Sequence, residues 1–125
     1  MKVLVIEDTE TKFLDIKQAL IQNKIVNITH KYSRNSGLLE LINNQYDLLI
    51  LDMQIPLDDD SFNILTDGGF EVLDEIIRTK NKIPVIICSS DAINADNYEN
   101  VVSVIRYNSM KDLSEDFWYA LKKNF

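Results

Sequence analysis

The sequence predicts an α/β domain built on a parallel sheet with helices on both of its faces. Three short runs of consecutive apolar residues are typical of strands buried on both faces, and two further stretches also have strand-like patterns. Apolar residues recur at helical spacing between these strands, and strands that alternate with helices form a doubly wound parallel sheet. The length of 125 residues matches one domain, so we expect residues 1–125 to fold as a single unit.

The predicted strands and helices follow one another along the chain. Strands are predicted at residues 3–6, 26–31, 48–51, 85–88 and 101–105. Helices are predicted at residues 10–23, after Ser36, after Gly68–Gly69, and near the C-terminus, where Ser109 and Asp112 resemble a capping box.

The order of the strands follows from the character of the second one. Residues 26–31 alternate apolar with polar side chains, which is typical of an edge strand. With the first and third strands as central neighbours, the order is 2-1-3-4-5, that of the flavodoxin-like fold. Residues 92–100 leave room for only a shortened fourth helix.

Polar side chains follow the buried strands at the point where each strand ends. Glu7 and Asp8 follow the first strand and Asp52 follows the third, while Ser89 and Arg106 end the fourth and fifth. Ligands of such sheets bind at the carboxyl ends of the strands, so these side chains are expected to converge. Ordinary loop carboxylates are the alternative, but all three acids directly follow buried strands, which favours a site.

The chemistry of this cluster indicates a metal ion and a phosphoryl group. Three neighbouring carboxylates repel one another unless a cation is present, and oxygen ligands without His or Cys favour Mg²⁺. A carboxylate beside Mg²⁺ can attack phosphorus and become an aspartyl phosphate. A hydroxyl and a cation from neighbouring strands can stabilise the oxygens of the transferred group.

Four segments in this order resemble the receiver domain of two-component response regulators. They are Val5–Asp8, Leu49–Pro56, Gly69–Leu73 and Ile83–Ser90. The resemblance spans nearly the whole chain. It implies a phosphoacceptor that takes its phosphoryl group from a histidine kinase or phosphotransfer protein and signals to an output protein by protein–protein contacts. It also implies a protein that assists its own phosphorylation and dephosphorylation and is not an enzyme.

The same resemblance implies a role for each residue of the cluster. Asp52 is then the phosphoacceptor, Asp8 binds Mg²⁺ directly, and Glu7 binds it through water. Gln54 offers its backbone carbonyl to the metal, and the hydroxyl of Ser89 holds a phosphoryl oxygen.

The segment after the fifth strand departs from the family pattern. Arg106 and Tyr107 stand where the family has Lys and usually a cis Pro, and Ser103 replaces a frequent aromatic switch residue. We expect a trans peptide before Tyr107, since a cis bond there costs about 3–4 kcal/mol. Arg106 keeps the positive charge, so we expect it to pair with Asp52 at rest and with the phosphate after transfer. These departures also leave open a pseudo-receiver, a protein-interaction module that works without phosphorylation.

Residues 57–68 form an insertion beside the proposed phosphorylation site. Its acidic and polar composition favours a solvated loop, while Phe62, Ile64 and Leu65 are compatible with an element that docks a partner or covers the site. A calcium-binding loop is disfavoured, because Phe62 and Asn63 stand where an oxygen ligand and Gly are required.

Composition and charge restrict the remaining possibilities. With 13 basic and 20 acidic residues the net charge is −7, so direct binding to nucleic acid is not expected. No apolar run is long enough to span a membrane. The single Cys88 fits a reducing cytoplasm.

Residues at the strand ends exclude one enzyme class and disfavour one class of cofactor-binding protein. A haloacid dehalogenase-type phosphatase needs a second Asp where Gln54 stands. A flavodoxin is disfavoured because Glu7 and Asp8 would repel the flavin phosphate.

Overall fold

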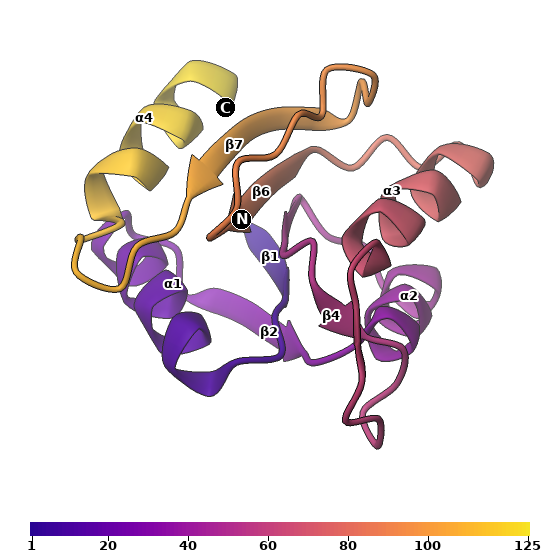
Figure 1. Ribbon diagram of the computed structural model, residues 1–125. Coiled ribbons are helices and arrows are strands. Elements are labelled where there is room, and N and C mark those ends of the chain that lie inside the picture. The colour runs from indigo at the N-terminus through magenta and orange to yellow at the C-terminus, as the bar shows by residue number, and fades with distance from the viewer.

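Five parallel strands form the central sheet of the computed structural model, which describes residues 1–125 (Figure 1). The strands of this sheet are β1 (Lys2–Ile6), β2 (Asn27–Lys31), β3 (Leu48–Leu51), β6 (Val85–Ser89) and β7 (Val101–Arg106). They lie in the order β2-β1-β3-β6-β7. Because β4 and β5 lie outside this sheet, the observed order is the predicted 2-1-3-4-5, and the flavodoxin-like fold is confirmed.

Two helices cover each face of the sheet (Figure 1). Helices α1 (Glu10–Gln22) and α4 (Ser114–Asn124) pack together on one face, and α2 (Arg34–Asn43) and α3 (Gly68–Arg78) pack together on the other. None of the four helices is long and apolar enough to cross a lipid bilayer.

Alternation along the strands divides the core into two halves. Val3 and Val5 of β1 belong to the cluster under α1 and α4, whereas Leu4 and Ile6 belong to the cluster under α2 and α3. The central strands bury apolar side chains on both faces, which explains their continuous apolar sequences. The residue that follows each strand is therefore directed to a defined face of the sheet.

Two helices begin at residues other than those the sequence suggested. Helix α2 is capped by Ser33, which forms a reciprocal capping box with Ser36, so Ser36 lies within the first turn. The predicted capping box of Ser109 and Asp112 is not formed, because α4 begins only at Ser114. The Asp112 carboxylate instead accepts a hydrogen bond from the Ser114 amide at 2.9 Å.

No helix forms between β6 and β7, so the expected shortening of the fourth helix is complete. Residues 90–100 contain turns only. The side chain of Asn94 accepts a hydrogen bond from the Asp96 amide, and that of Asn100 donates to the carbonyls of Asn81 and Ile83. Asn side chains that bond to the backbone in this way compete with helical hydrogen bonding. The outer part of β7 consequently lacks a covering helix on the face of the sheet that carries α2 and α3.

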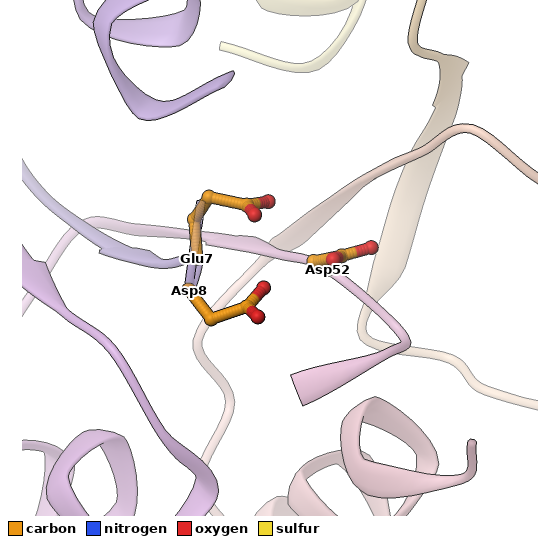
Figure 2. A group of neighbouring side chains, drawn as sticks. All are labelled: Glu7, Asp8 and Asp52. Carbon is orange, nitrogen blue, oxygen red and sulfur yellow. The ribbon is translucent and has the colours of Figure 1, made fainter. Parts of the chain in front are cut away.

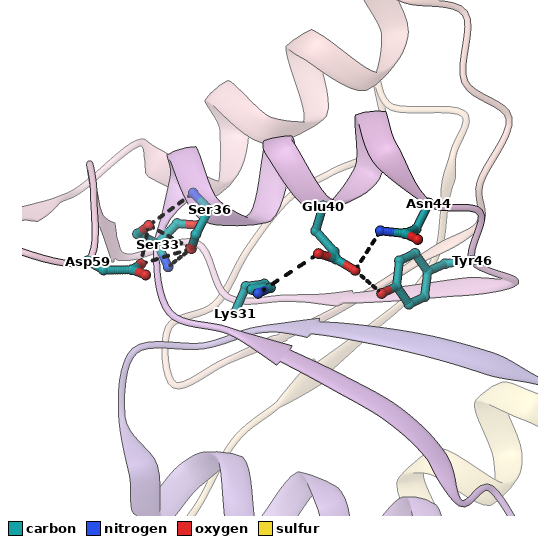
Figure 3. Close-up of polar contacts among 7 residues, drawn as sticks. All are labelled: Lys31, Ser33, Ser36, Glu40, Asn44, Tyr46 and Asp59. Carbon is teal, nitrogen blue, oxygen red and sulfur yellow. Dashed lines mark hydrogen bonds and ion pairs between the residues drawn. The ribbon is translucent and has the colours of Figure 1, made fainter.

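Most of the insertion lies in a small antiparallel hairpin that projects beside α2 and α3 (Figure 1). The first strand of this hairpin, β4 (Ile55–Pro56), directly precedes the insertion, and the second, β5 (Ile64–Leu65), lies within it. The Asp59 carboxylate accepts hydrogen bonds from the hydroxyls of Ser33 and Ser36 at 2.7 and 2.9 Å (Figure 3). Phe62 is fully exposed near the tip. The insertion is thus anchored to the start of α2, and Phe62 packs against nothing within the chain.

A second polar network lies on the same helix, farther from the insertion (Figure 3). Glu40 of α2 accepts hydrogen bonds from Asn44 and Tyr46 and forms an ion pair with Lys31 of β2 at 3.9 Å. These contacts join α2 to the edge strand and to the segment that leads into β3.

Candidate functional site

Three carboxylates converge at the carboxyl ends of β1 and β3 (Figure 2). The Asp52 amide donates to the Ile6 carbonyl at 3.2 Å, which continues the β1–β3 ladder and brings Asp52 beside Glu7. One carboxylate oxygen from each of Glu7, Asp8 and Asp52 lies within 4.8 Å of the others. Glu7, Asp8 and Asp52, which directly follow buried strands, therefore meet in space as the sequence predicts.

Alternation along the strands directs two of these acids toward α1. Ile6 and Leu51 point toward α2 and α3, so the next residues, Glu7 and Asp52, point toward the opposite face. Both carboxylates are nearly buried, with Asp52 only 9% exposed. The amide of Thr9 donates to Glu7 Oε2 at 3.0 Å, and that of Met53 donates to Asp52 Oδ1 at 2.8 Å.

The cation of the site is Lys12, which the sequence pattern did not single out. Its Nζ lies 2.9 Å from Glu7 Oε1 and 3.2 Å from Asp52 Oδ1. The same ammonium donates a hydrogen bond to the Cys88 carbonyl of β6 at 2.7 Å. Lys12 is 7% exposed and lies one turn before the buried Ile16 of α1. A lysine on the inward stripe of an amphipathic helix was the available signal.

Burial governs the protonation of these groups. It raises the pKa of Glu7 to about 7, and the charge on Asp52 adds to this effect while Lys12 opposes it. Burial also raises the pKa of Asp52, although Lys12 pulls in the other direction. For Lys12, burial alone would lower the pKa, but the charges on Glu7 and Asp52 outweigh burial and raise it. One lysine therefore does not neutralise the cluster.

Ser89 and Gln54 flank this cluster. Ser89 ends β6, the neighbour of β3, and is 2% exposed, with its Oγ accepting a hydrogen bond from the Asp91 amide at 3.2 Å. Gln54 follows Asp52 by two residues, is exposed, and donates from its side-chain amide to Asp91 at 2.8 Å. Asp91 thus connects the loops that follow β3 and β6.

The predicted resting pair of Arg106 with Asp52 is not formed, and that expectation was wrong. Arg106 is exposed, makes no ion pair, and donates from Nε to the Ser90 carbonyl at 3.1 Å. Ile105 points toward α1 and α4, so alternation directs Arg106 to the opposite face of the sheet. That face lacks its fourth helix, and the side chain extends into solvent.

Tyr107 lies on the same side of the sheet as Lys12. The chain contains no cis peptide bond, as expected for the Arg106–Tyr107 step. The Tyr107 ring lies 5.4 Å from Lys12 Nζ, and its hydroxyl donates to Asp15 of α1 at 2.6 Å.

Comparison with known families gives a match over most of the chain. Residues 3–108 match the family described as the response regulator receiver domain. This chain is a member of the response regulator receiver family. The acidic cluster therefore lies in a receiver domain of the kind found in two-component response regulators. Receiver domains are generally signalling modules and not enzymes. No curated protein matches the chain at a significant level.

Solved structures of other receiver domains share the fold. The signal receiver domain of a putative Luxo repressor protein from Vibrio parahaemolyticus is 21% identical with a TM-score of 0.71, covering 98% of this chain and 90% of that one. A receiver domain from Clostridium thermocellum is 27% identical with a TM-score of 0.65, covering 98% and 94%. The response regulator TrrA from Thermotoga maritima, in complex with Mg²⁺ and BeF, is 20% identical with a TM-score of 0.67, covering 96% and 99%.

Proposed function

We propose that this receiver domain accepts a phosphoryl group on Asp52 in a Mg²⁺-dependent step. The donor is a histidine kinase or a phosphotransfer protein, and the phosphorylated domain signals through protein–protein contacts. The observation that carries this proposal is the cluster of Glu7, Asp8 and Asp52 at the carboxyl end of the sheet, where the predicted phosphoacceptor lies beside two further carboxylates. The family of the chain supports the same function.

The donor set of the cluster fits a magnesium ion. It offers three carboxylates and no His or Cys, which is the oxygen-only chemistry that Mg²⁺ prefers. Glu7 Oε1 is buried without an aligned hydrogen bond, and its one ion-pair partner is the Lys12 ammonium. We propose that Asp8 and Asp52 bind the ion directly, Glu7 binds it through water, and Gln54 contributes its backbone carbonyl. When bound, the ion supplies positive charge that offsets the carboxylates and the phosphoryl oxygens.

Two known structures support this choice of ion. The similar TrrA structure contains Mg²⁺ together with BeF, and a similar structure of the response regulator Rcp1 is described as its Mn²⁺-bound form. Both ions favour oxygen ligands. We propose that the carboxylate cluster of this chain binds Mg²⁺ through the same kind of oxygen ligands.

The chain's own residues then have distinct roles in the transfer. Asp52 is the nucleophile, and the amide of Met53 orients its carboxylate by donating to Oδ1. The proposed role of Ser89 is to donate its hydroxyl proton in a hydrogen bond to a phosphoryl oxygen. In the resting structure that hydroxyl oxygen accepts from the Asp91 amide, so its own proton is free to be donated.

Phosphorylation by a small donor tests this function directly. Wild-type protein is incubated with phosphoramidate and Mg²⁺, and intact mass is measured over time. We expect wild type to gain the mass of one phosphoryl group and Asp52→Asn to gain none. Asp60→Asn is the matched control, because Asp60 is an exposed carboxylate in the insertion.

The outcomes separate the two candidate functions. Labelling of Asp52→Asn at the wild-type rate would remove Asp52 from its proposed role. Wild-type protein that gains no mass while remaining folded would support a phosphorylation-independent pseudo-receiver.

A further inference from the structure

We propose that Lys12 of α1, and not Arg106 of β7, is the cation that contacts the phosphoryl group on Asp52. This inference rests on the proposed phosphoacceptor function and deepens it. It assigns a role in phosphoryl transfer to a residue of the first helix, far in sequence from the segment where the family pattern would place the cation.

Lys12 is the side chain whose charge already lies at the reacting carboxylate. Its Nζ is 3.2 Å from Asp52 Oδ1 and 2.9 Å from Glu7 Oε1. No other Lys or Arg of the chain forms an ion pair with either acid. A phosphoryl group bonded to Asp52 would therefore lie next to this ammonium.

Besides the two carboxylates, Cys88 of β6 and Tyr107 after β7 hold the ammonium in place. The Cys88 carbonyl of β6 accepts a hydrogen bond from Nζ at 2.7 Å. The Tyr107 ring lies 5.4 Å from Nζ, and the Tyr107 hydroxyl is tied to Asp15 on the same helix as Lys12. The Tyr107 amide donates to the Ser89 carbonyl at 2.7 Å. A charge that is fixed before reaction stabilises a developing anion without costly reorganisation.

The contacts of Arg106 support the same assignment. Its side chain is exposed and forms no ion pair, whereas Lys12 is buried and contacts both Glu7 and Asp52. The Arg106 Nε is hydrogen-bonded to the Ser90 carbonyl. Tyr107, the next residue, occupies the α1 side of the sheet and packs against the core there. The Tyr107 ring therefore lies where the end of β7 approaches the site, and the positive charge at the site comes from Lys12 of α1.

The transfer step assigns Lys12 an electrostatic role. With phosphoramidate as donor, a carboxylate oxygen of Asp52 forms a bond to phosphorus as the P–N bond breaks. The electron pair of that bond goes to nitrogen, which already carries three hydrogens and leaves as ammonia. Lys12 stays protonated and transfers no proton. Its ammonium moves from the Asp52 carboxylate to the phosphoryl oxygens, whose charge it offsets.

The experiment compares three variants with wild type. Lys12→Met keeps the length of the side chain and removes its charge, Arg106→Ala removes the alternative cation, and Lys17→Met is the matched control. Lys17 is an exposed lysine on the same helix. The phosphorylation rate with phosphoramidate and Mg²⁺, the Mg²⁺ affinity of the unphosphorylated protein, and the thermal midpoint are measured for each.

The expected results have opposite directions for the two functional measurements. Lys12→Met should slow phosphorylation by about 100-fold, the effect of removing one preorganised group that stabilises developing charge. It should bind Mg²⁺ more tightly, by about fivefold or more, because a competing cation has left the carboxylates. A variant that merely loosened the fold would weaken both. Arg106→Ala and Lys17→Met should match wild type in both measurements.

Two results would overturn the inference while the proposed function stands. They are wild-type rates for Lys12→Met, and loss of phosphorylation in Arg106→Ala, each with Asp52 still labelled in wild type. An unlabelled wild type, or a labelled Asp52→Asn, would instead reject the proposed function itself.

A measurement on wild type covers the case in which Lys12→Met does not fold. With ¹⁵N-labelled lysine and arginine, addition of Mg²⁺ and beryllofluoride should shift the Nζ resonance of Lys12 and leave the Nε resonance of Arg106 unchanged. The reverse pattern would show that Arg106 is the contacting cation.

Discussion

The metal-free protein should lose stability as the pH rises through the weakly acidic range, because of Glu7. Burial and the neighbouring charge on Asp52 raise the pKa of Glu7 from 4.5 to about 7, against the opposing effect of Lys12. Between these two pH values the folded protein keeps a proton that the unfolded chain has released. The unfolded state then binds fewer protons, so the free energy of unfolding falls as the pH rises.

The size of this effect follows from the shift in the pKa of Glu7. One pKa unit corresponds to about 1.4 kcal/mol, so a shift from 4.5 to about 7 corresponds to about 3 kcal/mol of unfolding free energy. Asp52 acts in the same direction, since burial raises its pKa above the ordinary 3.8. His30 acts in the opposite direction, because burial lowers its pKa from 6.5, and its contribution to stability grows as the pH rises.

Urea unfolding at a series of pH values from 4.5 to 7.5, without divalent metal, measures this dependence. Comparison with Glu7→Gln isolates the contribution of Glu7, since Gln cannot ionise and the other titrating groups are retained. We expect the variant to lose most of the decline and to be more stable than wild type near neutral pH. Glu115→Gln, which alters an exposed carboxylate of α4, should keep the wild-type dependence.

Addition of saturating Mg²⁺ should flatten the wild-type curve. The ion competes with the proton for the carboxylates and stabilises the folded state that binds it. Parallel curves for wild type and Glu7→Gln in the absence of metal would refute the reasoning, because Glu7 would then have an ordinary pKa in the folded protein.

Three further predictions concern the structure around the site. Gly69→Ala should destabilise the fold by about 2–3 kcal/mol in urea unfolding, because its Cβ would lie 2.5 Å from the Asp52 carbonyl oxygen; an unchanged midpoint would contradict this contact. Asp59→Ala should cost about 1–2 kcal/mol and speed hydrogen exchange in the insertion, since two serine hydroxyls lose their acceptor, whereas Asp60→Ala should leave exchange unaltered. Cys88 should resist alkylation in the folded protein and react only after unfolding, because it is fully buried and burial raises its thiol pKa to about 12; rapid labelling of native protein would argue against this packing.

The sequence by itself determined the strand order and the place of the acidic cluster. Continuous apolar strands are buried on both faces of a sheet, and the alternating stretch that became β2 lies at the edge. Glu7, Asp8 and Asp52 directly follow such strands, and parallel strands end at one edge of their sheet. Local pattern and topology were sufficient there, because the positions depend on the backbone alone.

Only the tertiary structure decided which cation meets the carboxylates. Distance along the chain gives no sign that Lys12 lies against the Cys88 carbonyl of a strand more than seventy residues away. The positive charge of Arg106 is evident from the sequence, but the direction of its side chain depends on the alternation of β7 and on the absence of a helix beside it. A side chain's partner is set by the face on which it leaves its strand or helix, and by what packs on that face. The same reason explains why the polar insertion is anchored at the start of α2, a contact that composition alone could not indicate.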